Sequence, residues 1–206
     1  MANIKKVGVL VSGRGSNLQA LLDAAAAHVL GGEVAVVVSN VEAAPALERA
    51  RGAGVPALYR DHRGRSREAF DAEVASLLEE HGVDLVCLAG FMRRLSPAFL
   101  RAYPSRVVNV HPSLLPAFPG LEAQRQAFDH GVKVSGATVH LVDEGVDTGP
   151  IVLQEAVPVL ASDSAESLAA RILEAEHRIY PRAARILLEG RYRLDGRRLV
   201  VLETAA

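Results

Sequence analysis

The sequence predicts an α/β protein with a parallel, wound sheet, because short apolar runs alternate with longer amphipathic ones along its first half. Four apolar runs, at residues 7–11, 34–38, 84–90 and 106–111, have the continuous hydrophobicity of strands that are covered on both faces. Segments with helical spacing separate them. Strand followed by helix, repeated along the chain, is typical of a sheet whose strands run parallel.

Three segments in this half have helical spacing, at residues 17–26, 45–54 and 66–82. The last of them has an apolar stripe that includes Phe70, and Gly82 is placed to end the helix. Each lies between two of the apolar runs, or directly before one. They are therefore expected to be the helices that connect and cover the parallel strands.

The second half breaks this rhythm. Residues 133–142 and 151–159 are two β-like runs joined by the acidic turn DEGVDTGP, with too few residues between them for a crossover helix. They are expected to pair antiparallel or to form an extended excursion.

A long helix is predicted from Ser164 to Leu188, with Ser164 as its N-cap and Pro181 placed to kink or divide it. The segment YRLDGRRLVVL then predicts a hairpin with its turn at Asp195–Gly196. Because no repeat, low-complexity segment or linker interrupts the pattern, residues 1–206 are expected to form one domain.

Composition narrows the class of protein. The chain has 206 residues, of which 50% are hydrophobic, and a formal net charge of −1. That balance gives no support for nucleic-acid binding, which usually leaves a strongly basic footprint. The single cysteine, Cys87, lies in an apolar run and is expected to be buried. The N-terminal apolar stretch is too short for a signal peptide, and no run is long enough to span a bilayer, so a cytoplasmic protein without membrane contact is expected.

A glycine-rich loop, SGRGSNLQALL at residues 12–22, follows the first predicted strand and leads directly into a helix. Such a loop lets backbone N–H groups and the positive end of the helix dipole face an anion. It differs from a dinucleotide-binding loop, because Leu18 replaces the third glycine and the second strand ends in Ser39–Asn40 instead of an acidic residue. A single phosphate is the better ligand, and an ordinary strand-to-helix turn is the alternative.

Asn109 and His111 end the strand at 106–111. Two residues apart on a strand, they point to the same side, at the edge where parallel sheets bind ligands. The prolines at positions 112, 116 and 119 stiffen the chain that follows. An asparagine amide beside an imidazolium suits the stabilisation of an oxyanion in acyl transfer. No G-x-S-x-G motif precedes a helix, so a direct transfer is favoured over a covalent intermediate.

Two alternatives remain open at this point. Zinc could be held by His111, His140 and Asp147, although their spacing matches no standard ligand pattern. Otherwise His140 is expected to be a hydrogen-bonded structural histidine. The acidic residues Asp143, Glu144 and Asp147 could also be a solvated turn.

Five sequence blocks extend over nearly the whole chain: GRGSNLQ, AGFMRRLSP, NVHPSLLPAFPG, DEGVDTGPI and EAEHRIYP. In this order they resemble the phosphoribosylglycinamide formyltransferase family, folate-dependent formyltransferases of purine biosynthesis. The resemblance implies a Rossmann-like domain with a mixed, mostly parallel twisted sheet flanked by helices. It also implies a phosphate-binding half at residues 1–103 and a catalytic and folate-binding half at 104–206.

The same resemblance implies the substrates, glycinamide ribonucleotide and 10-formyltetrahydrofolate, with no metal, and a monomer or weak homodimer. Glu176 would contact the ribose, Arg67 the benzoate–glutamate arm of the folate, and residues 92–95 the pterin, while Asp147 would keep His111 protonated. The implied site residues are, for catalysis, Asn109, His111 and Asp147; for glycinamide ribonucleotide, Gly15, Ser16, Asn17 and Glu176; and for the folate, Arg67, Met92, Arg93, Arg94, Leu95, Asn109, Asp143, Glu144, Gly145, Val146 and Asp147.

Other enzymes that act on formyl-folates are the main alternative functions. Methionyl-tRNA formyltransferase, formyltetrahydrofolate hydrolase and sugar-nucleotide formyltransferases share the Asn-x-His pair and a distant aspartate, but the first two carry additional domains for which 206 residues leave no room. A non-catalytic nucleotide-binding module would not need a charged oxyanion site. One departure concerns the residues after FPG, where many members of the family carry histidines and this chain has Glu122 and Gln124.

Overall fold

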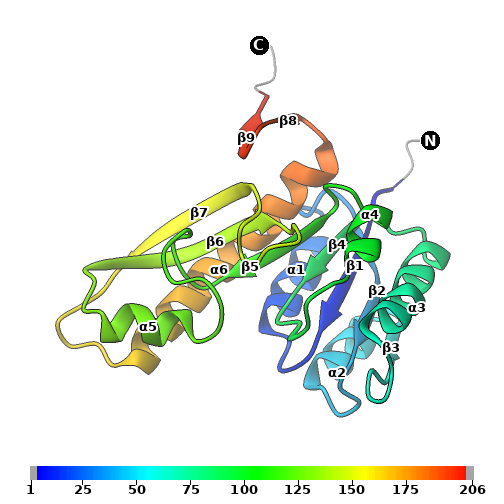
Figure 1. The fold of residues 1–206 in the computed structure, drawn as a ribbon, viewed down its shortest axis with the longest axis horizontal. Helices are drawn as coiled ribbons and strands as arrows, with labels where there is room; N and C mark the ends of the chain where they lie inside the picture. Colours follow the sequence, from blue (N-terminus) through cyan, green and yellow to red (C-terminus); the bar gives the residue numbers. More distant parts are fainter. Residues whose placement is uncertain (1–3, 203–206) are drawn as a thin grey trace.

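The apolar runs of the first half form the parallel centre of one twisted sheet (Figure 1). The computed structural model describes residues 4–202, and within them the strand order is β3-β2-β1-β4-β5-β6-β7-β9-β8. The elements are β1 Lys6–Val11, α1 Ser16–Ala26, β2 Glu33–Ser39, α2 Pro45–Gly52, β3 Ala57–Tyr59, α3 Arg67–Glu80, β4 Leu85–Leu88, α4 Pro97–Ala102, β5 Val107–His111, α5 Ala123–Asp129, β6 Val134–Leu141, β7 Ile151–Pro158, α6 Ala165–Glu189, β8 Tyr192–Asp195 and β9 Arg198–Val201.

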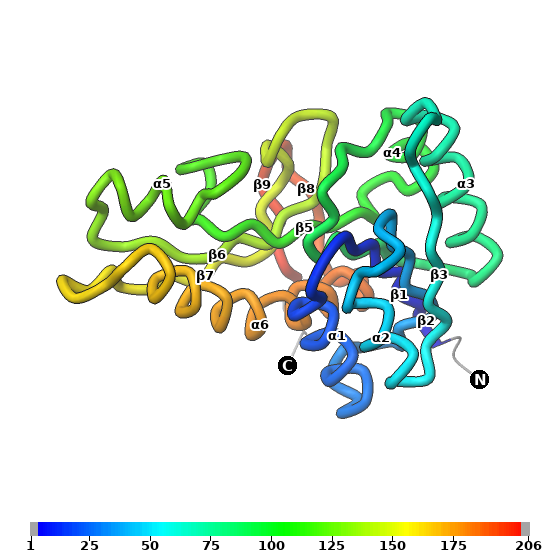
Figure 2. Tube along the Cα trace, turned by 90° about the horizontal axis from the view of Figure 1, so that it is seen from below, coloured from blue at the N-terminus to red at the C-terminus, as the bar shows by residue number. Residues whose placement is uncertain are grey.

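Alternation along the strands separates two hydrophobic layers. On β1, Val7 and Val9 pack with α1 and α6 on one face, whereas Leu10 packs with α3 and α4 on the other. Figure 2 shows α1 beside α6, with α3 and α4 across the sheet from them. The prediction of an α/β domain with a mixed, mostly parallel sheet flanked by helices is thereby confirmed.

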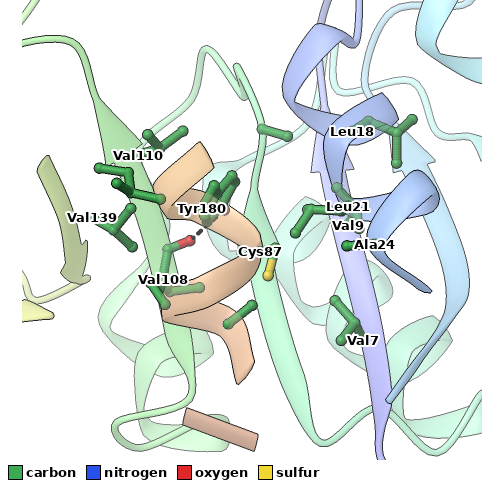
Figure 3. Close-up of a cluster of buried hydrophobic side chains, with 14 of the residues drawn as sticks. Val7, Val9, Leu18, Leu21, Ala24, Cys87, Val108, Val110, Val139 and Tyr180 are labelled. Atoms are coloured by element: carbon green, nitrogen blue, oxygen red, sulfur yellow. Dashed lines mark hydrogen bonds between the residues drawn. The ribbon is translucent and has the colours of Figure 1, made fainter. Parts of the chain in front are cut away.

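Tyr180 joins the long helix α6 to the middle of the sheet (Figure 3). It is fully buried, and its hydroxyl bonds to the carbonyl oxygens of Leu88, at 2.8 Å, and Val108, at 3.2 Å. Cys87 lies in the same core with no exposed surface, as expected, and burial raises the pKa of its thiol to about 12. These contacts hold α6 against β4 and β5. They thereby also fix the position of Glu176, which lies one helical turn before Tyr180, relative to the sheet.

The antiparallel excursion of the second half is confirmed. β5 pairs with β6 and β6 with β7, both antiparallel, and β9 then adds to β7 in parallel. The C-terminal hairpin also forms, but its pairing of Asp195 with Arg198 leaves Gly196 and Arg197 as the two turn residues. The turn is therefore one residue later than predicted, because Asp195 still belongs to the ladder.

Three short elements were not predicted, and the helix is not divided at Pro181, which was one of the two outcomes expected there. β3, α4 and α5 have 3, 6 and 7 residues, too few for a clear hydrophobic period. Pro181 does not divide α6, which continues to Glu189. Proline has no N–H and so removes one backbone hydrogen bond of the helix. Buried residues on both sides of it, among them Tyr180 and Ala183, hold the helix in the core despite this loss.

None of the helices within residues 4–202 combines the length and the apolar character that crossing a membrane requires.

Candidate active site

The glycine-rich loop between β1 and α1 needs glycine at position 15. Gly15 is the N-cap of α1 and has φ 75°, in the left-handed region. A Cβ there would lie 2.7 Å from Cβ of Ala46, at the start of α2. The loop is held against α2 by the Ala46 N–H, which donates to the Gly13 carbonyl at 3.2 Å, and by Nε of Arg49, which donates to the Arg14 carbonyl at 2.9 Å. The first turn of α1 thus presents its unpaired N–H groups on a fixed backbone.

Replacing Gly15 with alanine is expected to lower the free energy of unfolding by about 1–3 kcal/mol, from the left-handed backbone and the contact with Ala46. Gly13→Ala is the matched control, because a Cβ at Gly13 would meet no atom within 4 Å and its backbone is not left-handed. Urea unfolding of both variants measures the difference. Equal midpoints for the two variants would contradict a sterically fixed loop.

Glu176 of α6 reaches the same loop. Its Oε2 accepts a hydrogen bond of 2.6 Å from the Asn17 amide, and its side chain is 5% exposed. Burial raises the pKa of the Glu176 carboxyl to about 7, against the lowering effect of that hydrogen bond. Oδ1 of Asn17 is buried and has no hydrogen-bond partner among the described residues. The pair therefore offers acceptors beside the loop, which suits a ligand with hydroxyl groups.

The raised pKa makes stability depend on pH. Because the folded-state pKa lies above the ordinary value of 4.5, the neutral carboxyl stabilises the fold fully below pH 4.5, and this contribution is lost as pH rises through about 7. This difference between the folded-state and ordinary pKa values corresponds to about 3 kcal/mol in the free energy of unfolding. Glu176→Gln keeps an acceptor for Asn17. Between pH 5 and pH 8, its free energy of unfolding, measured with urea, is expected to rise by about that amount relative to the parent. Glu174→Gln, an exposed change on the same helix, should show no such gain.

The carboxyl end of β5 brings together three polar side chains. Val108 and Val110 face the core under α6, so Asn109 and His111 point to the opposite face. Antiparallel pairing places His140 of β6 directly across from Asn109, and Asn109 Nδ2 lies 3.4 Å from His140 Nε2. His111 is 4% and His140 2% exposed. The expectation that Asn109 and His111 share a face is thereby met, and His140 joins them.

Asp147 lies across from both histidines. Its Oδ2 is 3.4 Å from His111 Nδ1, its Oδ1 is 3.6 Å from His140 Nε2, and Oδ2 also accepts a 2.8 Å hydrogen bond from the Gly120 N–H. Burial would raise the pKa of the Asp147 carboxyl, but the contacts with His140, Gly120 and His111 outweigh it and hold that pKa below its usual value. The carboxylate therefore faces the two rings in its charged form.

Both ring nitrogens of His111 face acceptors. Nδ1 faces Asp147, and Nε2 lies 2.8 Å from the Phe118 carbonyl oxygen, to which it donates. A ring protonated on both nitrogens satisfies both partners. Nε2–H can stabilise an oxyanion only after it has left the Phe118 carbonyl and turned toward the negatively charged oxygen. Among the described residues, the Asn109 amide has one contact, a long one with His140, and it is the less occupied donor.

Side chains of β6 and β7 hold the proline-rich segment after His111 through hydrogen bonds. Thr138 is fully buried, and its hydroxyl donates to the Ser113 carbonyl at 2.6 Å and accepts from the Leu115 N–H at 3.0 Å. Gln154 donates to the Leu115 carbonyl at 2.9 Å. The rigidity of this segment thus comes from side chains of the neighbouring strands as well as from its prolines.

The predicted folate-binding segments meet at one point. Arg94 donates from Nη2 to the carbonyl oxygen of Glu144 at 2.9 Å, which joins residues 92–95 to the acidic turn. Within that turn, Asp143 accepts hydrogen bonds from the Gly145 N–H and the Thr148 hydroxyl. The turn is therefore internally structured, and not merely a solvated loop.

Hydrophobic side chains are exposed on these segments, as on a surface that receives an apolar ligand: Met92 is 67% and Val146 46% exposed. Arg67 is also exposed, at the first turn of α3, and its recorded ion pair is with Glu68, at 3.5 Å. Within residues 4–202, no hydrogen bond or ion pair joins it to the acidic turn or to residues 92–95. Glu122 is exposed in the left-handed region at the N-cap of α5, and Gln124 is half-buried on that helix.

The contacts of His140 and of the Ser12–Asn40 pair were not predicted from the sequence. His140 is buried and hydrogen-bonded, as expected, and it also contacts Asn109 and Asp147. Ser12, at the end of β1, accepts a 2.9 Å hydrogen bond from the Met92 N–H and donates to Asn40 Oδ1 at 2.6 Å. Only the antiparallel register of β5 and β6 could have indicated His140, and no local pattern indicates the Ser12–Asn40 pair.

A metal site is not supported by the described residues. His111, His140 and Asp147 do converge, but no group of three histidine, cysteine, aspartate or glutamate side chains within residues 4–202 is arranged to hold a metal ion.

The chain is similar to known proteins in sequence and in fold. Residues 5–184 match the formyl transferase family. The chain is 52% identical over 189 residues to the trifunctional purine biosynthetic protein adenosine-3 of Drosophila melanogaster, covering 90% of this chain but only 14% of that protein. It is 45% identical to the phosphoribosylglycinamide formyltransferase of Escherichia coli, over 93% of this chain and 94% of the relative. The crystal structure of glycinamide ribonucleotide transformylase 1 from Symbiobacterium toebii superimposes with a TM-score of 0.96, at 56% identity, covering 98% of this chain and 96% of the other.

Proposed function

The chain belongs to the formyl transferase family, and we propose that it transfers the formyl group of 10-formyltetrahydrofolate to the amine of N1-(5-phosphoribosyl)glycinamide in purine biosynthesis. The products are the N-formyl ribonucleotide and tetrahydrofolate. The observation that carries the proposal is the meeting of Asn109, His111 and Asp147 at the end of β5. That point lies on the same edge of the parallel sheet as the loop for one phosphate.

The ribonucleotide occupies the side of β1 and α6. Its phosphate takes the backbone N–H groups of Gly15, Ser16 and Asn17, where the start of α1 favours negative charge. The ribose hydroxyls donate to Glu176, whose buried carboxyl already accepts from Asn17. This arrangement directs the glycinamide amine toward the end of β5.

The formyl-folate occupies the side of residues 92–95 and the acidic turn. Ser12 accepts from the Met92 N–H, and the Arg94 side chain donates to the backbone carbonyl of Glu144 in the acidic turn. The exposed side chains of Met92 and Val146 provide apolar surface for the pterin ring. Arg67 provides a positive charge for the carboxylates of the glutamate arm.

The reaction is a direct displacement. The glycinamide nitrogen first adds to the formyl carbon, and the bond from that carbon to the folate nitrogen then breaks; the attacking nitrogen loses a proton that the folate nitrogen gains. Negative charge gathers on the formyl oxygen between these events. Asn109 Nδ2 and His111 Nε2, once turned from the Phe118 carbonyl, donate to that oxygen.

Asp147 supports this step electrostatically. Its carboxylate faces Nδ1 of His111 and so fixes the orientation of the ring and stabilises its cationic form. The Gly120 N–H holds the carboxylate in place at 2.8 Å. The proton on the attacking amine leaves through water beside this carboxylate.

An assay with both substrates tests the proposed function. Purified protein is mixed with 10-formyltetrahydrofolate, with and without glycinamide ribonucleotide, and loss of the formyl-folate is followed. Turnover is expected only when the ribonucleotide is present. Equal turnover without it would identify a hydrolase, and turnover with a sugar-nucleotide amine in its place would identify a different acceptor.

A further inference from the structure

A buried carboxylate on α3 has no part in the mechanism above. Asp71 is 1% exposed and lies among apolar side chains of the layer formed by α3 and α4, next to Phe70. Burial raises the pKa of its carboxyl, while the Ser96 N–H and the nearby Arg93 and Arg67 act in the opposite direction. A buried carboxylate is costly unless hydrogen bonds and opposite charges compensate it. Its position therefore calls for a role that uses these neighbours.

The first neighbour is the backbone at the end of the folate-binding segment. Asp71 Oδ2 accepts a 2.5 Å hydrogen bond from the Ser96 N–H. Ser96 is itself fully buried and is the N-cap of α4, with its hydroxyl accepting from the Phe99 N–H at 3.3 Å. The carboxylate thus fixes the point at which residues 92–95 pass into α4.

The second neighbour is the side chain of Arg93. Its guanidinium carbon lies 5.0 Å from the centroid of the Phe70 ring, and Phe70 precedes Asp71 on α3. Arg93 Nε is a buried donor and Asp71 Oδ1 a buried acceptor, and neither has a hydrogen-bond partner among the described residues. Opposite charges in this partly dry environment attract each other more strongly than they would in water.

We propose that Asp71 is a positioning residue for the folate-binding segment. It holds the Ser96 backbone and draws the Arg93 side chain toward α3, which keeps the backbone of residues 92–95 in one conformation. Residues 15–17 and Glu176, which take the ribonucleotide, have no recorded contact with Asp71. The inference rests on the proposed function and assigns Asp71 to one substrate only.

Asp71→Asn tests this assignment. Asparagine keeps an acceptor for the Ser96 N–H and removes the charge beside Arg93. The KM for 10-formyltetrahydrofolate is expected to rise about tenfold, in line with the contribution of one charged hydrogen bond. The kcat at saturating folate and the KM for the ribonucleotide should stay within about twofold of the parent. Asp195→Asn, an equal change of charge in the exposed hairpin, is the control and should alter neither KM.

Three results would overturn the proposal: an unchanged KM for the folate, an equal rise of both KM values, or a fall in kcat alone. If Asp71→Asn fails to fold, Arg93→Gln takes its place and must show the same selective rise. Direct binding of tetrahydrofolate, measured by calorimetry, separates this test from that of the function. A parent that binds no folate refutes the function, whereas equal binding by parent and variant refutes only the role of Asp71.

Discussion

Replacing His111 with alanine is expected to lower kcat about 10²–10³-fold, the usual loss when one oxyanion donor is removed. The ring lies at the end of β5, with one nitrogen toward Asp147 and the other 2.8 Å from the Phe118 carbonyl, where a formyl oxygen can take over that hydrogen bond. Alanine removes both contacts. The KM values should change far less than kcat, because the donor acts mainly in the transition state. Steady-state kinetics with each substrate varied in turn measures the split.

Two controls belong with this variant. Far-ultraviolet circular dichroism and a melting curve must show that the chain remains folded. His28→Asn removes another imidazole at an exposed position, where asparagine tolerates the left-handed backbone of His28. Its kcat should equal that of the parent. A His111→Ala enzyme with a near-normal kcat would rule out the proposed oxyanion site.

Asp147→Asn is expected to cause the second large loss, about 10²-fold in kcat. Asparagine has nearly the shape of aspartate, tolerates the φ of 54° at this position, and can still accept from the Gly120 N–H. What it removes is the negative charge that faces His111 and His140. The variant therefore isolates the electrostatic role of Asp147 from its structural one, and kcat at saturating substrates measures that role.

The charge on Asp147 also affects stability. Because the folded-state pKa of the Asp147 carboxyl lies below the ordinary value of 3.8, its contribution to stability is present above pH 3.8 and is lost as pH falls through the folded-state pKa. The difference in unfolding free energy between parent and Asp147→Asn should therefore shrink in acid. Asp195→Asn again serves as the matched change of charge. Unchanged turnover of Asp147→Asn would mean that His111 does not depend on this carboxylate.

The central architecture was predictable because its signals are long. Continuous apolar runs define β1, β2, β4 and β5, and the 25 residues of α6 give a full amphipathic period. β3, α4 and α5 lack such signals, because β3 has three half-buried residues and the two helices, of 6 and 7 residues, make fewer than two turns. Pro181 was misleading for a different reason: the local cost of a proline is outweighed by the burial of its neighbours in the core.

The site was predictable where a motif holds its residues together and not where the tertiary fold does. Asn109 and His111 are two residues apart, and the loop at Gly15 is continuous with a helix. The Asn109–His140 contact depends on strand register, and the Ser96–Asp71 hydrogen bond joins residues 25 apart in sequence. The occupation of His111 Nε2 by the Phe118 carbonyl is likewise a property of the folded loop. Those contacts decide the orientation of the donors, which a sequence pattern cannot specify.

The fate of a labelled formyl group tests the central claim most directly. The protein is mixed in a single turnover with 10-formyltetrahydrofolate carrying a carbon-14 formyl group and with glycinamide ribonucleotide, and the products are separated. Direct transfer predicts that the label appears on the ribonucleotide amine in step with the tetrahydrofolate formed, and that His111→Ala slows both equally. Label that appears as free formate, at a rate independent of the ribonucleotide, would contradict the account.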